Sequence, residues 1–123
     1  MNDISVIIPI NEINEIIKEF LVKCVQSVKP EKVYIVHADT KEVNEFFKSW
    51  NKPEGLNLEV LVNKGKSDFC SQVNYGVENM ETEWFSILEV DDEYSKNWFK
   101  NVKKYMEAYD DVDILLPLVV DVD

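Results

Sequence analysis

The chain has 123 residues, which is room for one ordinary domain, and 46% of them are hydrophobic, which is enough to build a buried core. Its 24 acidic and 13 basic residues give a net charge of −11 at pH 7. Because such a surface repels the phosphates of nucleic acids and of anionic lipids, the composition excludes nonspecific binding to either, although a metal or a few local lysines can still hold a small anion.

The first half of the chain is predicted to alternate two strands with two helices. Residues 3–10 are β-branched and almost continuously apolar, as in a strand that is covered on both faces. Apolar residues then recur at helical spacing over 13–28, and residues 32–38 predict a second strand. Thr40 can cap the second helix. The apolar stripe of that helix consists of Val43, Phe46, Phe47 and Trp50.

The second half is predicted to continue the alternation with three strands and two helices. The strands are expected at 56–62, 83–90 and 113–120, and the helices at 69–80 and 98–109. Ser67 or Asp68 can cap the first of these helices, and Ser95 can cap the second. Pro117 lies inside the last strand and places that strand at an edge or a bulge.

Strands and helices that alternate in this way predict a single α/β domain over residues 1–123. We expect a Rossmann-like three-layer α/β/α fold with a mostly parallel sheet of about five strands, four helices and right-handed crossovers. In such sheets, ligands bind at the carboxyl ends of the strands, where the strand order reverses. A strand order of 3-2-1-4 would put this reversal between the first and fourth strands, so the loops at 9–12 and 89–95 would flank one crevice.

Neither the amino terminus nor the cysteines indicate export. The start, "MNDISVIIPI", has an acid in place of the basic flank of a secretory signal, and no stretch approaches the roughly 18 apolar residues of a membrane helix. Cys24 lies on the apolar face of a predicted helix and Cys70 lies at the start of another, so both resemble small core residues. We therefore expect a cytoplasmic protein that is not inserted in a membrane.

Four acids follow the predicted fourth strand within five residues: Glu89, Asp91, Asp92 and Glu93. If the strand continues to Asp91, the side chains of Glu89 and Asp91 share a face, with their Cα atoms about 7 Å apart. Two like charges so close repel each other, and a divalent cation would reverse that repulsion; oxygen ligands suit Mg²⁺ or Mn²⁺. The alternative is a solvated loop in which Asp92 and Glu93 favour the start of the next helix through its dipole.

The third strand-to-helix loop contains "NKGKS", which invites comparison with a phosphate-binding loop. That motif requires a glycine at position 60, where Val60 stands, so an ATPase is excluded. Lys64 and Lys66 can still hold an anion near a helix N-terminus, or they can be solvated. His37 is the only histidine and has no partner pattern for a hydrolase triad, whereas Asp39 could hydrogen-bond a base or a ribose.

Three motifs in chain order resemble the nucleotide-binding half of glycosyltransferase family 2, whose members are inverting enzymes of the GT-A fold. The first strand and its loop read "SVIIPINE" over 5–12. The second motif is a pair of N-x-G elements, from Asn63 to Gly65 and from Asn74 to Gly76. The fourth strand ends in "EVDD" at 89–92, which is similar to the Asp-x-Asp-Asp motif of the family. The resemblance covers nearly the whole chain.

This resemblance implies roles for particular residues at the carboxyl edge of the sheet. Asp91 would ligate Mn²⁺ or Mg²⁺ on the donor diphosphate, with Asp92 supporting the cation and Glu89 contacting the ribose or a metal-bound water. Asn11 would border the nucleoside, and Asp39 would sit near the base. The full set of residues expected to contact the nucleotide sugar is Pro9, Ile10, Asn11, Asp39, Lys64, Lys66, Asn74 and Glu89.

The resemblance also implies an activity. We expect a metal-dependent domain that binds a nucleotide-diphosphate sugar, first of all a UDP-sugar, for inverting transfer to an unknown acceptor hydroxyl. In the family, the acceptor site and the catalytic base lie beyond a further strand and helix, so we expect a longer chain and assign no catalytic base. The predicted last strand could pair with that missing region or with a second copy of the chain. Two alternatives stay open: a catalytically incompetent module that binds a sugar nucleotide or a protein partner, and a nucleotidyltransferase that uses the same carboxylates.

Overall fold

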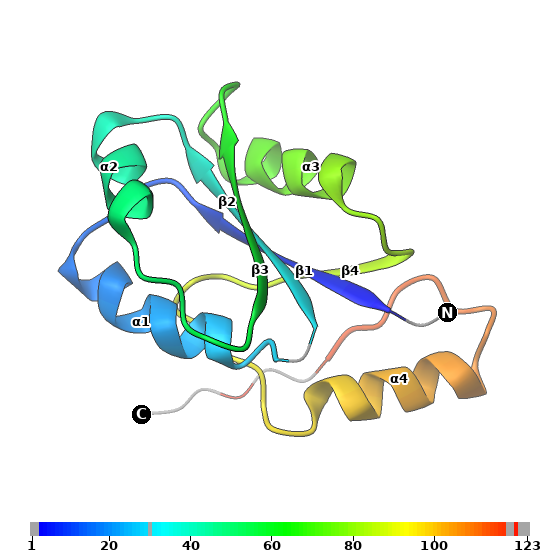
Figure 1. Ribbon diagram of the computed structural model, residues 1–123. Coiled ribbons are helices and arrows are strands. Elements are labelled where there is room, and N and C mark those ends of the chain that lie inside the picture. Colours follow the sequence, from blue (N-terminus) through cyan, green and yellow to red (C-terminus); the bar gives the residue numbers. More distant parts are fainter. Residues whose placement is uncertain (1–2, 30, 118–119, 121–123) are drawn as a thin grey trace.

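The computed structural model describes residues 3–29, 31–117 and 120, and it forms a layered α/β fold (Figure 1). Strands and helices alternate strictly along the chain, which confirms the predicted α/β, Rossmann-like class. Four strands lie in the described part of the chain, against about five expected. The elements are β1 (Ile4–Ile10), α1 (Glu15–Gln26), β2 (Lys32–Ala38), α2 (Lys41–Ser49), β3 (Asn57–Asn63), α3 (Phe69–Asn79), β4 (Trp84–Ile87) and α4 (Trp98–Ala108).

The four strands form one parallel sheet in the order β3-β2-β1-β4. The condition set for the crevice is therefore met, and the strand order reverses between β1 and β4. β1 is paired with β2 as far as Ile10 opposite His37, and β2 is paired with β3 as far as Ala38 opposite Asn63. Three strands thus end at nearly the same level, which aligns the loops that follow them.

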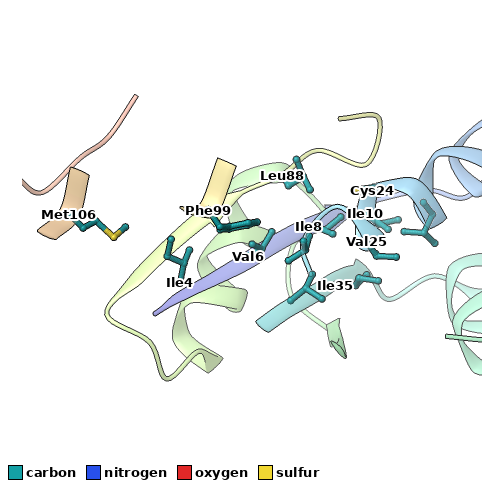
Figure 2. Packing of buried hydrophobic residues seen from close by; sticks show 13 residues of the cluster. Ile4, Val6, Ile8, Ile10, Cys24, Val25, Ile35, Leu88, Phe99 and Met106 are labelled. Carbon is teal, nitrogen blue, oxygen red and sulfur yellow. The ribbon is translucent and has the colours of Figure 1, made fainter. Parts of the chain in front are cut away.

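The larger hydrophobic core lies between one face of the sheet and the helices α1, α2 and α4 that cover it (Figure 1). Alternate residues of β1 point into it, because successive side chains of a strand point to opposite faces. There they pack against Cys24 and Val25 of α1 and Phe99 of α4 (Figure 2). Ile7 points to the other face, which α3 covers. The β1 residues of the larger core are Ile4, Val6, Ile8 and Ile10.

Pro9 explains why β4 is short. β1 and β4 stay paired as far as Ile7 opposite Ile87, and the N–H of Leu88 still donates to the C=O of Ile7 at 2.9 Å. In a parallel ladder the C=O of Leu88 would next accept from the N–H of residue 9, because residues two apart present their backbone groups to the same neighbouring strand. Pro9 has no N–H, so the ladder ends there. The predicted fourth strand, 83–90, is therefore too long at its carboxyl end.

Side chains cap three of the four helices. Asn14, Thr40 and Asp68 each accept a hydrogen bond from the backbone N–H three residues further on, as N-cap residues do. The predicted caps Thr40 and Asp68 are thus confirmed. α4 begins after Asn97 without a side-chain cap, and Ser95 contributes only its backbone C=O, which accepts from a helix N–H at 3.1 Å. The predicted capping role of the Ser95 side chain is therefore wrong.

The predicted fifth strand is not formed by residues 113–117 and 120; residues 118 and 119 lie outside the described part of the chain. Ile114 and Leu116 are 75% and 91% exposed, so no neighbouring strand covers them. Only Leu115 packs against the larger core. Among the helices that the structure describes, none is both long and apolar enough to cross a bilayer.

Candidate functional site

A chain of three side-chain amides joins two loops at the carboxyl edge of the sheet. Gln72, in the first turns of α3, is fully buried and donates from Nε2 to Oδ1 of Asn11 at 2.8 Å. Its Oε1 accepts from Nδ2 of Asn63, also at 2.8 Å. Asn63 holds its own loop as well, because it accepts from the N–H of Gly65 and donates to the C=O of Lys66, both at 3.1 Å. Gln72 therefore ties the loop after β1 to the loop after β3.

The glycine of the second N-x-G motif lets α3 approach the sheet. A Cβ on Gly76 would lie 2.9 Å from Cγ2 of Ile7, closer than ordinary contact. Gln72 lies one turn earlier on the same side of α3 and faces the sheet with it. Asn74 is about 200° around the helix from Gly76 and is exposed. The structure thus places Asn74 on the outer face of α3, and its contact with a nucleotide stays a prediction.

The acidic segment 89–93 forms a turn that rests on α1. The N–H of Asp92 donates to the C=O of Glu89 at 2.9 Å, and the Sγ–H of Cys24 points to the same carbonyl oxygen at 3.6 Å. This geometry corrects the expected placement of Glu89 and Asp91 on one face of a strand. β4 ends at Ile87, so the two carboxylates belong to a turn and their side chains are exposed.

Tyr94 fastens the end of this turn to the rest of the domain. Its N–H donates to Oγ of Ser27, the C-cap residue of α1, at 3.1 Å, and its hydroxyl lies 2.6 Å from Oγ of Ser86 on β4. The ring of Tyr94 packs against Trp98 and Phe99, with centroids 4.4 and 4.7 Å away. Burial raises the pKa of Tyr94 to about 12. Both ends of the acidic turn are therefore held by partly buried contacts, while its carboxylates face solvent.

The electrostatic field of the turn suits a cation. Burial, together with the nearby charges of Asp92, Asp91 and Glu93, raises the pKa of the Cys24 thiol to about 12. Negative potential is thus concentrated where the turn meets α1. No three His, Cys, Asp or Glu side chains within residues 3–29, 31–117 and 120 are gathered closely enough to hold a metal ion by themselves. Magnesium commonly takes only one or two protein carboxylates and completes its shell with phosphate oxygens and water, so this set of donors fits a cation that binds together with a phosphate ligand.

A cavity of about 440 Å³ lies where β2, α2 and β3 meet. It brings together Asp39 and Lys64, two residues of the predicted site. Nδ2 of Asn44 donates to Oδ1 of Asp39 at 2.8 Å, whereas the buried Oδ1 of Asn44 has no hydrogen-bond partner among the described residues. The imidazole of His37 stacks on Phe47 with ring centroids 4.7 Å apart. The remaining lining residues are Lys48, Val60 and Val62.

The two predicted lysines stand on the loop that leads into α3. Lys64 and Lys66 are both exposed. The N-terminus of α3 is already capped by Asp68, whose carboxylate accepts from the backbone N–H and the hydroxyl of Ser71; these hydrogen bonds lower the pKa of Asp68. Because this helix end already holds an anion, a phosphate near the loop would depend on the lysines and not on the free N–H groups of α3.

Sequence reasoning missed two polar residues of this edge, Gln72 and Asn44. Both lie on helix faces that are otherwise apolar, three residues from Phe69 and Phe47 respectively. A polar residue inside an apolar helical stripe was the available signal, since a buried amide must find hydrogen-bond partners. Their partners could not be identified without the tertiary structure, because Asn11 is 61 residues away from Gln72.

The pattern of the family described as "Glycosyl transferase family 2" matches residues 5–122. No curated protein matches the chain significantly. Among solved structures, the crystal structure of S. aureus TarS 1-349 is similar with a TM-score of 0.64 and 16% identity, covering 88% of this chain and 33% of that chain. The same protein in complex with UDP-GlcNAc gives a TM-score of 0.65 at 16% identity, covering 88% of this chain and 32% of that one. The chain thus spans about a third of the TarS 1-349 chain, and the likeness confirms the fold.

Proposed function

Because the chain belongs to glycosyl transferase family 2, we propose that it forms the donor-binding part of a glycosyltransferase that takes its sugar from a nucleoside diphosphate. The observation that carries this proposal is the position of the polar clusters. The amide chain, the lysine loop and the acidic turn all follow the carboxyl ends of strands, and the strand order reverses between β1 and β4. Ligands of open α/β sheets bind at this kind of reversal.

A UDP-sugar is the donor that we propose to test first. The similar TarS structure was solved in complex with UDP-GlcNAc, and the present chain shares the fold of the domain that it matches there. Asn11 and Asp39 would contact the nucleoside from two neighbouring loops. Lys64 and Lys66 would meet the charge of the diphosphate, which the net charge of −11 would otherwise repel.

We propose that Asp91 ligates Mn²⁺ or Mg²⁺ together with the diphosphate, with Asp92 supporting the cation and Glu89 contacting the ribose or a metal-bound water. The cation would act as a Lewis acid that stabilises the leaving nucleoside diphosphate. The contribution of the chain is to hold the turn in place, through the contacts of Cys24 and Tyr94, and to present carboxylates with little reorganisation. Attack by an acceptor hydroxyl on the anomeric carbon would invert its configuration. We assign neither the acceptor site nor the base that activates the acceptor to residues of this chain.

A thermal-shift panel tests the proposal. The purified chain is mixed with UDP, CDP, GDP, ADP and UDP-GlcNAc, each with Mn²⁺ or with EDTA. Ligand at 100 times its dissociation constant stabilises the folded state by about 2.7 kcal/mol, which raises the midpoint by roughly 5–15 °C for a domain of this size. We expect a shift that depends on Mn²⁺ and is largest for uridine nucleotides.

The matched variants are Asp91→Asn and Asp111→Asn, which remove one exposed carboxylate each. Asp111 follows α4, away from the acidic turn, so its substitution should leave the shift unchanged. Asp91→Asn should abolish the dependence on Mn²⁺. Equal shifts with every nucleotide, or an Asp91→Asn protein that responds like the wild type, would rule out the proposed site.

A further inference from the structure

The hydrogen bonds of the amide chain Asn63–Gln72–Asn11 all run the same way from donor to acceptor. The backbone of the loop after β3 determines this direction. The N–H of Gly65 can only donate and the C=O of Lys66 can only accept. Asn63 must therefore turn Oδ1 toward Gly65 and Nδ2 toward Lys66, as the two 3.1 Å contacts show. This leaves Nδ2 of Asn63, and not its oxygen, to face Gln72.

The orientation passes along the chain one amide at a time. Since Nδ2 of Asn63 donates to Gln72 at 2.8 Å, Gln72 must present Oε1 to Asn63 and Nε2 to Asn11. Since Nε2 of Gln72 donates at 2.8 Å, Asn11 must present Oδ1 to it. The NH₂ group of Asn11 is the last donor of the amide chain, and it has no hydrogen-bond partner among the residues that the structure describes. Gln72 is 0% exposed, so water cannot substitute for either of its partners.

We propose that this chain makes Asn11 a dedicated hydrogen-bond donor at the crevice, and that Gln72 is the positioning residue that orients it. The inference deepens the proposed function and rests on it for the identity of the ligand. The group that Asn11 meets must be an acceptor oxygen of the nucleotide, either a carbonyl of the base or an oxygen of the ribose or diphosphate. A carbonyl oxygen of Asn11 in the same place would repel either one.

Gln72→Glu reverses the donor-to-acceptor direction of the amide chain with almost no change in the shape of the side chain at position 72. An ionised carboxylate has no donor, so Asn11 must turn its NH₂ toward position 72 and present Oδ1 to the crevice. When the introduced carboxyl is protonated, it donates to Asn11 and restores the native direction. UDP should therefore bind the variant about tenfold or more weakly than the wild type near pH 8, which is the size expected for one mispaired hydrogen bond. The deficit should shrink as the pH falls through the pKa of the introduced carboxyl.

The experiment measures the affinity for UDP in Mn²⁺ by calorimetry, for the wild type and for Gln72→Glu, from about pH 5 to pH 8. The ratio of the two affinities cancels the titration of the nucleotide itself. Asn11→Ala, at an exposed position, should lower the affinity for UDP to a similar extent at every pH. This variant tests the inference even if Gln72→Glu does not fold. Ser5→Ala is the matched control: it removes a buried 2.6 Å hydrogen bond to Thr82 at the opposite edge of the sheet and should lower stability without changing the affinity for UDP.

CDP distinguishes the C4 carbonyl of uracil from the other possible acceptors. If Asn11 faces C4, where uracil has a carbonyl and cytosine an amino group, Gln72→Glu near pH 8 should bind UDP more weakly and CDP more tightly than the wild type does. If Asn11 faces the C2 carbonyl that both bases share, or ribose or phosphate oxygens, the affinities for both nucleotides should fall alike. A ratio of UDP affinities that stays constant from pH 5 to 8, or an Asn11→Ala protein with wild-type affinity, would overturn the inference.

The exchange of side-chain amide protons, measured by NMR without ligand, separates this inference from the proposed function. The NH₂ protons of Asn63 and Gln72 should exchange slowly with solvent, and those of Asn11 quickly. In Gln72→Glu near pH 8, the Asn11 protons should become protected. A wild-type protein that binds no nucleotide would refute the proposed function, and the exchange rates would still decide the direction of the chain; slow exchange at Asn11 in the wild type would refute that direction.

Discussion

Gly76 of α3 lies so close to Ile7 of β1 that a Cβ at position 76 would stand 2.9 Å from Cγ2 and 3.1 Å from Cδ1 of Ile7. This contact sets the distance between α3 and the sheet. Gln72 is one turn earlier on the same helix, and its two hydrogen bonds to loop residues depend on that distance. The close approach of Gly76 to Ile7 therefore supports the amide chain as well as the packing of the core.

We expect Gly76→Ala to lower the free energy of unfolding by about 1 kcal/mol. Overpacking against Ile7 costs about 1–3 kcal/mol, and the higher helix propensity of alanine returns up to about 1 kcal/mol. Urea unfolding measures the change. Glu78→Ala, at an exposed position of the same helix, should change stability by less than about 0.5 kcal/mol. In an Ile7→Ala background the cost of Gly76→Ala should disappear, and an unchanged cost there would show that this contact is not the cause.

Stability should fall in alkaline solution because of two buried groups near the acidic turn. Burial raises the pKa of Cys24 from 9.0 to about 12 and that of Tyr94 from 10.0 to about 12. Both neutral forms are favoured by folding, so their contribution is complete below pH 9 and is lost as the pH rises from 9 toward 12. Each group adds a slope of up to about 1.4 kcal/mol per pH unit within its window. Urea unfolding between pH 7 and 11 should show this decline.

Tyr94→Phe provides the control for that decline. The variant should be less stable at pH 7, because it loses the hydrogen bond to Ser86, but its stability should fall less steeply above pH 10. Tyr109→Phe changes a tyrosine that is 57% exposed and should keep the wild-type slope. Identical slopes for wild type and Tyr94→Phe would contradict the assignment of the alkaline transition to Tyr94.

The two cysteines should differ strongly in reactivity toward a thiol reagent. Cys24 is fully buried beneath the acidic turn, whereas Cys70 is exposed at the start of α3. At about pH 8 we expect one fast and one slow thiol, because the thiolate is the reactive form and the Cys24 thiol must be uncovered before it ionises. Cys70→Ser should remove the fast phase, and Cys24→Ser should leave it. A fast Cys24 would show that the turn does not stay on α1.

An ion pair attaches α4 to the residue that precedes β2. Nζ of Lys103 contacts the carboxylate of Glu31, a residue that is only 9% exposed. We expect Lys103→Met to lower the free energy of unfolding by about 1–2 kcal/mol, since it leaves a mostly buried carboxylate without its cation, and the exposed third of Lys103 reduces the effect. Lys104→Met, at the next and exposed position, should be close to neutral in the same urea unfolding measurement. Equal effects of the two substitutions would exclude the ion pair as the cause.

Where the prediction of the fourth strand failed, a contact between distant residues decided the outcome. The apolar run 83–90 has the composition of a strand throughout, but Pro9, far earlier in the chain, withholds the N–H that residue 88 would need to extend the ladder. The expected pair of strand carboxylates at Glu89 and Asp91 failed for the same reason. The structure turns the chain there and rests it on Cys24.

The amino-acid sequence by itself determined the alternation of strands and helices, the caps at Thr40 and Asp68 and the edge of the sheet at which polar residues gather. These follow from local periodicity, from hydrogen bonds within three residues and from the handedness of parallel crossovers. Only the tertiary structure decided where β4 ends, how the acidic turn is held, and that Gln72 links Asn11 to Asn63. A buried amide requires partners, but which residues meet it depends on how separate elements pack together, and neither composition nor spacing encodes that arrangement locally.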